Sequence, residues 1–261
     1  MLNVIRTGRA GGRALLIAHG LFGSARNWGV LSKRLGAGRE VLAVDMRNHG
    51  ASPWFDSNDY HDMAGDLAEV IRAEGAGPVD LLGHSMGGKA AMVLALTRPD
   101  LVARLVIADI APAGYGHSQA HLIEAMQAVD LARISSRREA DAALSGAVPE
   151  ASLRAFLLQS LDPSATPPRW RLNLPVLRDY MPEIIGFPEL EGRFAGPALF
   201  LTGGESDYVR AEHHARIRAL FPGASLESID GAGHWLHAEK PREFEAALRR
   251  FLESGRPGAG S

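Results

Sequence analysis

The feature that most constrains this chain of 261 residues is a glycine-flanked serine between an apolar run and a helix-like run. Gly83, Ser85 and Gly87 form the pattern Gly-x-Ser-x-Gly, directly after the mainly apolar run 79–82 and before the helix-like residues 90–96. Small residues on both sides of the serine permit a tight strand-to-helix turn in which the serine backbone takes a positive φ. The sequence therefore predicts a strand, a turn and a helix, with the Ser85 hydroxyl lifted clear of the sheet.

Short apolar runs alternate with amphipathic stretches over most of the chain. This alternation is typical of an α/β fold, a mostly parallel sheet covered by helices on both faces. The predicted core strands are 14–18, 41–44, 79–82, 105–108, 198–201 and 225–229, with a shortened strand at 2–5. One helical face carries four apolar side chains, which are Met63, Leu67, Val70 and Ile71. A further helix runs from Ala90 and ends before Pro99.

The alternation stops between residues 115 and 192, where helical patterns follow one another and no strand is predicted. We therefore expect a core made of residues 1–114 and 193–254, with a helical cap, residues 115–192, inserted in it. The glycine-rich residues 255–261 are expected to form a flexible tail.

The serine motif also comes close to a phosphate-binding loop. Gly83, Gly88 and Lys89 match Gly-x-x-x-x-Gly-Lys, but Ala90 stands where Ser or Thr would hold magnesium. Asp109, after the apolar run 105–108, would be the second magnesium ligand in this alternative. Nucleotide hydrolysis stays open as an alternative that Ala90 disfavours.

A serine nucleophile needs a base, and one of the ten histidines stands out by position. His234 lies in a glycine-containing loop after the predicted strand 225–229 and before Pro241, which starts a terminal amphipathic helix. Parallel sheets place their active sites at the carboxyl ends of strands. We therefore expect His234 to be the base for Ser85, and His237 to be a partner or a surface residue.

Several separated motifs together resemble an alpha/beta-hydrolase fold serine esterase, over nearly the whole chain. These are the His-Gly pair at 19–20, the loop 45–52, the serine motif at 83–89 and the Gly-His pair at 233–234. The Asp-Ile-Ala-Pro at 109–112 and the segment 234–241 are similar to compact bacterial acyl esterases, a branch related to abhydrolase-domain proteins of mitochondria. The resemblance implies hydrolysis of carboxylic esters through an acyl-enzyme on Ser85.

Two aspartates could orient His234 as the third member of the triad. Asp109 ends the strand 105–108, and Asp207 lies just past the strand 198–201, the commoner acid position in the superfamily. The acid holds the histidine in the tautomer that accepts the serine proton. In the branch that this chain resembles, the Asp-Ile-Ala-Pro motif supplies the acid, so we prefer Asp109 and expect Asp207 to cap its loop.

The resemblance also implies the oxyanion hole, the pair of N–H groups that bind the negative oxygen of the tetrahedral intermediate. The backbone of Met86 supplies one donor and that of Leu21 the second, with Phe22 as the alternative. His19 would orient this loop and take no part in proton transfer. The alternative is that residues 19–23 form an ordinary glycine turn.

In the resembled family, a cap covers the serine, so its apolar inner face would form the acyl pocket. The candidate residues recur at helical spacing and are Leu122, Ile123, Met126, Leu153, Phe156, Leu157, Leu174, Leu177 and Tyr180. We expect most of them to pack the cap against itself and a few to face substrate. The loop 162–168 is a candidate hinge.

Composition excludes several function classes. The net charge of −2, without a basic stripe, gives nucleic acid no binding surface. The chain has no cysteine, which excludes disulfides and thiol catalysis, and no apolar run long enough to span a membrane. No secretory signal pattern is present, so the cytoplasm is the expected compartment.

We expect no cofactor and no metal, because serine chemistry requires neither. His117, His121 and Glu124 have a spacing that could bring three metal ligands onto one helix face, but a solvated face is the preferred interpretation.

The sequence therefore predicts a serine esterase for small-molecule acyl esters, or thioesters, of short to medium chain length. Carbon–carbon bond hydrolases, cofactor-free haloperoxidases and acyltransferases share such a triad and remain alternatives. A non-catalytic receptor for a small ligand is another. Dehalogenases and epoxide hydrolases are disfavoured because they use an aspartate where this chain has Ser85.

Overall fold

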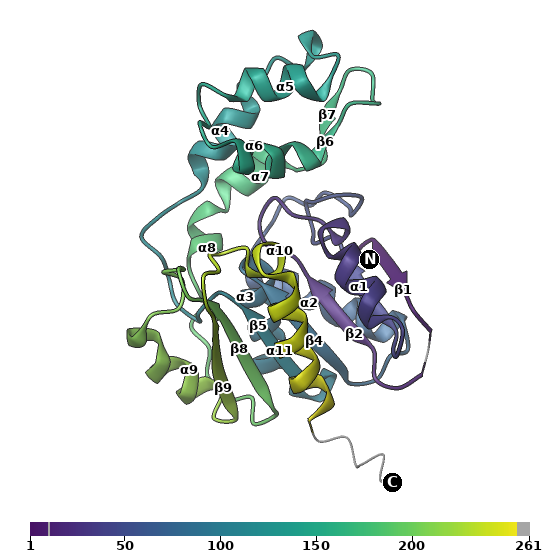
Figure 1. Ribbon diagram of the computed structural model, residues 1–261, viewed down its shortest axis with the longest axis vertical. Coiled ribbons are helices and arrows are strands. Elements are labelled where there is room, and N and C mark those ends of the chain that lie inside the picture. The colour runs from purple at the N-terminus through teal and green to yellow at the C-terminus, as the bar shows by residue number, and fades with distance from the viewer. Residues whose placement is uncertain (10, 255–261) are drawn as a thin grey trace.

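The computed structural model describes residues 1–9 and 11–254 and contains a central seven-stranded sheet. The strand order is β1-β3-β2-β4-β5-β8-β9 (Figure 1). The bounds are β1 Val4–Thr7, β2 Leu15–Ala18, β3 Val41–Val44, β4 Val79–His84, β5 Val102–Ala108, β8 Ala198–Gly203 and β9 Ala224–Ile229. β1 runs antiparallel to β3, and the other neighbours are parallel. The expected mostly parallel α/β sheet is confirmed.

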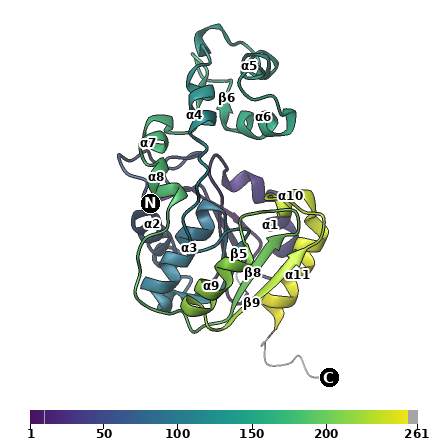
Figure 2. The ribbon, with the colours of Figure 1, turned by 90° about the vertical axis from the view of Figure 1, so that its left-hand side faces the viewer.

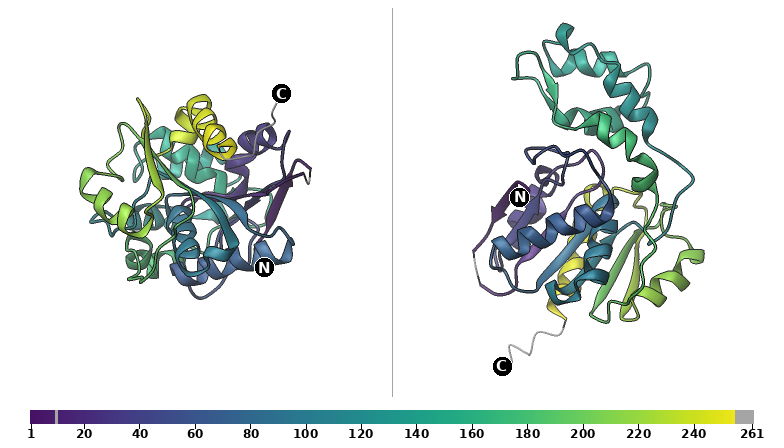
Figure 3. Two further views of the ribbon diagram at one scale, coloured as in Figure 1. Left: turned by 90° about the horizontal axis from the view of Figure 1, so that it is seen from below. Right: turned by 180° about the vertical axis from the view of Figure 1, so that it is seen from behind.

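Helices cover both faces of this sheet. On one face lie α1 (Gly29–Leu35), α10 (Leu236–Glu239) and α11 (Pro241–Glu253), and on the other α2 (Tyr60–Ala73), α3 (Met86–Thr97) and α9 (His214–Leu220). Figure 3 shows the blue helices α2 and α3 on the side away from α11. Alternate residues of each strand enter the two hydrophobic layers: Leu15 and Ile17 pack with α11, whereas Leu16 and Ala18 pack with α2 and α3.

The two helices beside the serine turn differ in pattern because they differ in burial. In α3 every residue from Met86 to Leu96 is buried, so this helix is apolar nearly all round. α2 is amphipathic, and its N-cap Asp59 accepts a hydrogen bond from the Asp62 N–H at 2.9 Å. The shared face of Met63, Leu67, Val70 and Ile71 is buried, as predicted.

A buried charge cluster closes the amino-terminal end of the parallel strands, away from Ser85. The Asp80 carboxylate of β4 is fully buried, and Arg39 donates to it from 2.5 Å. Arg13 and Arg104 lie 3.7 and 3.8 Å from its other oxygen. The cluster joins β4 to β5 and to the loop before β3, so it stabilises the end of the sheet opposite Ser85.

Most of the chain between β5 and β8 forms a separate group of short elements, which lies beyond the sheet in Figures 1 and 2. Its elements are α4 Ala120–Gln127, α5 Arg137–Leu144, α6 Ala151–Leu157, β6 Leu161–Asp162, β7 Arg169–Trp170, α7 Leu174–Asp179 and α8 Met181–Ile185. The expectation that no strand occurs here is wrong, since β6 and β7 pair antiparallel. With two residues each, they are too short to show an alternating pattern. Residues 162–168, the candidate hinge, mostly form the turn of this hairpin.

Two further expectations need correction or restriction. The first strand is Val4–Thr7 and not 2–5, because its ends are set by pairing with β3, from Val4 opposite Val44 to Thr7 opposite Val41. The tail predicted for 255–261 lies outside the described residues. The boundaries of the cap at 114/115 and 192/193 stay predictions.

Candidate active site

Ser85 occupies the predicted turn between β4 and α3. Its φ is 51° and its ψ is −119°, a conformation that a residue with a side chain seldom adopts. Both flanking glycines are needed at this turn. A Cβ on Gly83 would lie 2.3 Å from the Gly87 carbonyl oxygen, and a Cβ on Gly87 would lie 2.5 Å from the Ala18 carbonyl oxygen.

The structure brings Ser85, His234 and Asp109 into one line. The Ser85 Oγ lies 3.0 Å from His234 Nε2, and His234 Nδ1 lies 2.7 Å from Asp109 Oδ2. Because a carboxylate can only accept, Nδ1 carries the proton and donates it to Asp109. Nε2 is then free to accept the hydroxyl proton of Ser85.

Asp109 follows β5 directly, and its carboxylate is fully buried. The Gly203 N–H donates to Oδ1 at 2.9 Å, and the Ser206 hydroxyl donates to Oδ2. These donors fix the orientation of the carboxylate. Asp207 is not brought to His234: its side chain is 86% exposed and lies 3.6 Å from Arg210.

His84, the last residue of β4, holds the other side of the His234 loop. Its Nε2 lies 2.9 Å from the His234 carbonyl oxygen, so Nε2–H donates there. Burial, together with the nearby His237 and His234, lowers the pKa of His84 well below its usual value. His84 is therefore neutral at physiological pH and acts as a hydrogen-bond donor.

The loop after β2 contains two of the three candidate oxyanion donors, Leu21 and Phe22, and the third is Met86. Leu21, Phe22 and Met86 all line the cavity over Ser85. The Phe22 N–H donates to His49 Nε2 at 3.2 Å, whereas Met86 is the first residue of α3, where N–H groups point out of the helix. The engagement of the Phe22 amide leaves Leu21 as the better partner for Met86.

Two buried histidines hold this loop. His19 Nε2 accepts from the Met46 N–H at 2.9 Å, and its Nδ1 lies 2.7 Å from the Gly20 carbonyl oxygen. Burial lowers the pKa of His19, and that of His49 to about 3. Both rings are therefore neutral at physiological pH and link the loop after β2 to the loop after β3.

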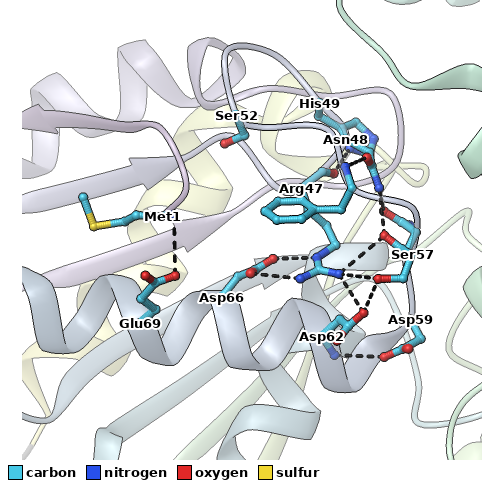
Figure 4. A network of polar contacts seen from close by, with 12 residues as sticks. Met1, Arg47, Asn48, His49, Ser52, Ser57, Asp59, Asp62, Asp66 and Glu69 are labelled. Carbon is cyan, nitrogen blue, oxygen red and sulfur yellow. Dashed lines mark hydrogen bonds and ion pairs between the residues drawn. The ribbon is translucent and has the colours of Figure 1, made fainter.

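The loop after β3 is fixed by an ion-pair network, shown in Figure 4. The Arg47 guanidinium donates to both oxygens of Asp66, at 2.6 and 3.0 Å, and to Asp62 at 2.7 Å. The next residue, Asn48, accepts from the Asn173 amide at 3.0 Å, which joins this loop to the start of α7. The loop therefore ties the core to the segment between β5 and β8.

A cavity of about 810 Å³ lies over Ser85, between the core and the segment after β5. Leu122, Leu153 and Phe156 line it, and the other six candidate residues of the cap do not. Ile123, Met126, Leu157, Leu174 and Leu177 are instead buried in the larger of the two hydrophobic clusters.

Lys89 also lines this cavity, but its ammonium group is not available for a phosphate. Nζ donates to the carbonyl oxygens of Ile184, Ile185 and Gly186 at the end of α8, at 2.9 Å for Ile185. Nζ also lies 4.8 Å from the centre of the Tyr115 ring. Burial lowers the pKa of Lys89 to about 7. The lysine ties α8 to α3, so the phosphate-loop alternative has no free ammonium group.

The metal alternative likewise finds no support in the geometry. α4 begins at Ala120, so His117 precedes the helix and does not share a face with His121 and Glu124. Within residues 1–9 and 11–254, no three His, Cys, Asp or Glu side chains are grouped so that they could hold a metal ion. In the same described part, no helix combines the length and apolar character needed to cross a membrane.

Sequence reasoning missed Tyr208, whose ring stacks on the imidazole of His234 with centroids 3.9 Å apart. Its only local signal is its place in the loop after β8, at the carboxyl edge of the sheet, beside Asp207. Sequence reasoning also assigned no role to His84.

Comparison with known proteins gives consistent results. The model of the "Alpha/beta hydrolase family" matches residues 15–247. The chain is 44% identical to the sn-1-specific diacylglycerol lipase ABHD11 of Mus musculus, over 92% of this chain and 80% of that protein. It is 40% identical to the Esterase YbfF of Escherichia coli K12, over 91% and 92%. A solved structure described as a marine microorganism esterase superposes with a TM-score of 0.92 at 36% identity, covering 96% of this chain and 99% of that one. The chain therefore belongs to the alpha/beta hydrolase family.

Proposed function

We propose that this protein is a serine esterase that hydrolyses small carboxylic esters through an acyl-enzyme on Ser85. The observation that supports this most directly is the line of Ser85, His234 and Asp109, with contacts of 3.0 and 2.7 Å. Relatives described as esterases and lipases, at 35 to 44% identity, support ester hydrolysis as the reaction class.

In the first half-reaction, the Ser85 Oγ bonds to the ester carbonyl carbon while its proton moves to His234 Nε2. The carbonyl oxygen becomes an oxyanion, which accepts hydrogen bonds from the N–H groups of Leu21 and Met86. The start of α3 adds its positive dipole end at the same place. Asp109 stabilises the imidazolium that has formed.

The tetrahedral intermediate collapses when the bond to the leaving oxygen breaks, and His234 gives its proton to the departing alcohol. Water then attacks the acyl-enzyme, with His234 again accepting a proton, and the acid product leaves as Ser85 regains its hydrogen. The same steps cleave a thioester, with a thiol as the leaving group. No cofactor is needed in either half-reaction.

The cavity supports a small-molecule substrate. Its volume of about 810 Å³ is in the range of pockets for drug-sized ligands. Its lining includes Phe22, Met86 and Ile110 of the core and Leu153 and Phe156 of the segment 115–192. We assign this apolar part to the acyl chain, of short to medium length, and residues 115–192 to a cap over it.

The test is hydrolysis of p-nitrophenyl esters from acetate to palmitate, with one thioester matched in acyl chain. Wild type should hydrolyse the shorter esters, and Ser85→Ala should lose at least about 10⁴-fold in kcat. Ser145→Ala is the matched control, since Ser145 is exposed at the end of α5 and is not among the residues that line the cavity. Wild-type activity in Ser85→Ala would refute the nucleophile. A folded wild type without activity on any ester would leave a ligand-binding hydrolase fold.

A further inference from the structure

Tyr208 lies against the face of the proposed catalytic base, and it is held there by the segment that leads from β5 to α4. The two rings are 3.9 Å apart between centroids and inclined by only 21°, so they are stacked. His84 approaches the same imidazole with centroids 4.9 Å apart and a tilt of 40°. The His234 ring is therefore confined by Tyr208 and by His84.

Both ends of Tyr208 are held by residues that precede α4. The Gln119 amide donates to the Tyr208 hydroxyl at 3.2 Å. The Tyr115 hydroxyl donates to the Tyr208 carbonyl oxygen at 2.7 Å and accepts from the Ala111 N–H at 2.9 Å. Burial raises the pKa of Tyr208, so its hydroxyl stays protonated and remains a hydrogen-bond partner.

Tyr208 is also connected to the carboxylate that orients His234. Its N–H donates to Ser206 Oγ at 3.3 Å, and that hydroxyl donates to Asp109. The short loop after β8 therefore contacts the base through the Tyr208 ring and the acid through Ser206.

From these contacts we infer that Tyr208 is a positioning residue for His234 and that Gln119 couples Tyr208 to the cap. This inference rests on the proposed function. The tyrosine ring keeps the imidazole in the plane that reaches both Ser85 and Asp109. It also presents its electron-rich face to the imidazolium that forms when Ser85 attacks. The hydrogen bond from Gln119 keeps the ring in place.

The first test compares Tyr208→Leu with Tyr208→Phe. Leucine keeps apolar cover over His234 but removes the π face, whereas phenylalanine keeps the stack and removes only the hydroxyl. We expect Tyr208→Leu to lower kcat about 10-fold or more, with KM within about 3-fold, because small misplacements of a catalytic group are costly. Tyr208→Phe should recover most of that loss. Tyr180→Leu, in a tyrosine outside the cavity lining, is the control and should match wild type.

The second readout is the NMR chemical shift of the His234 ring protons at fixed pH, which is independent of turnover. The titratable groups around this ring are Asp109, His84, His237 and Tyr208. Only the last is changed in the variants. Loss of the stacked ring should move this chemical shift downfield in Tyr208→Leu, because an aromatic ring shields protons that lie over its face. Tyr208→Phe should leave it near the wild-type value.

The link to the cap is tested by a double-mutant cycle of Tyr208→Phe and Gln119→Leu. Each change removes the same hydrogen bond, so each should lower kcat about 2-fold, and the double variant should lose no more than either single one. Additive losses would refute the coupling. A Tyr208→Leu protein with wild-type kcat and an unchanged chemical shift of the His234 ring would refute the positioning role. An inactive wild type with the expected NMR shift would refute the proposed function alone.

Discussion

The two candidate acids allow a matched prediction. Asp109→Asn and Asp207→Asn are the same chemical change in two loops at the carboxyl edge of the sheet. Asp109 is fully buried and contacts His234, whereas the Asp207 side chain is 86% exposed and faces Arg210. We predict a large loss of activity for Asp109→Asn and almost none for Asp207→Asn.

The size of the first effect follows from the hydrogen bonds at residue 109. The Gly203 N–H donates to Oδ1, so an asparagine there must place its own oxygen at that position. Its NH₂ group then points at His234 Nδ1, which becomes an acceptor, and the ring proton moves to Nε2. Nε2 can no longer accept the proton of Ser85. In a serine triad this tautomer error lowers kcat roughly 10⁴-fold, about 5 kcal/mol of barrier.

The assay is kcat/KM on a short p-nitrophenyl ester, with thermal unfolding measured in parallel to show that each variant is folded. Asp207→Asn should stay within about 2-fold of wild type, because an exposed ion pair contributes little. The reasoning is refuted if Asp109→Asn keeps more than about a tenth of the activity, or if Asp207→Asn is the more damaging change.

Two further predictions concern stability. Burial lowers the pKa of His237 to about 4, against about 6.5 in an unfolded chain, so the unfolded state binds the proton first as the pH falls. The resulting loss of unfolding free energy is absent above pH 6.5 and grows down to about pH 4, where it reaches at most about 3 kcal/mol. His237→Phe keeps the stack on Trp28 and should weaken the fall in unfolding free energy between pH 6.5 and pH 4. Urea titrations in which the unfolding free energies of variant and wild type fall equally with pH would contradict this. Asp80→Asn removes the charge from the buried arginine cluster and should cost about 3 kcal/mol of unfolding free energy. Because the cluster lies at the far end of the sheet from Ser85, kcat/KM of the folded variant should stay within about 2-fold, and a specific loss of kcat would contradict this.

The fold was predictable because its signals are local and strong. The buried strands of the parallel sheet are mainly apolar, and the small residues around Ser85 permit few alternatives to a tight turn. The positive φ of 51° at Ser85 agrees with the prediction from the motif alone. Failures occurred where tertiary pairing sets the limits, as in β1, whose ends depend on β3, and in the two-residue strands β6 and β7.

The site was predictable only in part. Ser85 and His234 are marked by their glycine neighbours and their order, but both Asp109 and Asp207 follow strands, and only the loop geometry decides which one reaches the histidine. The contact between Gln119 and Tyr208 joins residues 89 positions apart, and no sequence pattern records it. The partners of Lys89 at the end of α8 lie 95 to 97 positions away along the chain, and no sequence pattern marks them either.

Mapping a covalent adduct shows whether Ser85 is the residue that forms the acyl-enzyme. Wild type is treated with a fluorophosphonate, digested with trypsin and analysed by mass spectrometry. The peptide 73–89 contains Ser85 as its one hydroxyl-bearing residue, so a mass increase there identifies the site without fragmentation. We expect one phosphonyl group on this peptide, and we expect esterase activity to fall in proportion to labelling. Ser85→Ala should carry no adduct. An adduct on another peptide, or unlabelled protein that is active and folded, would contradict it.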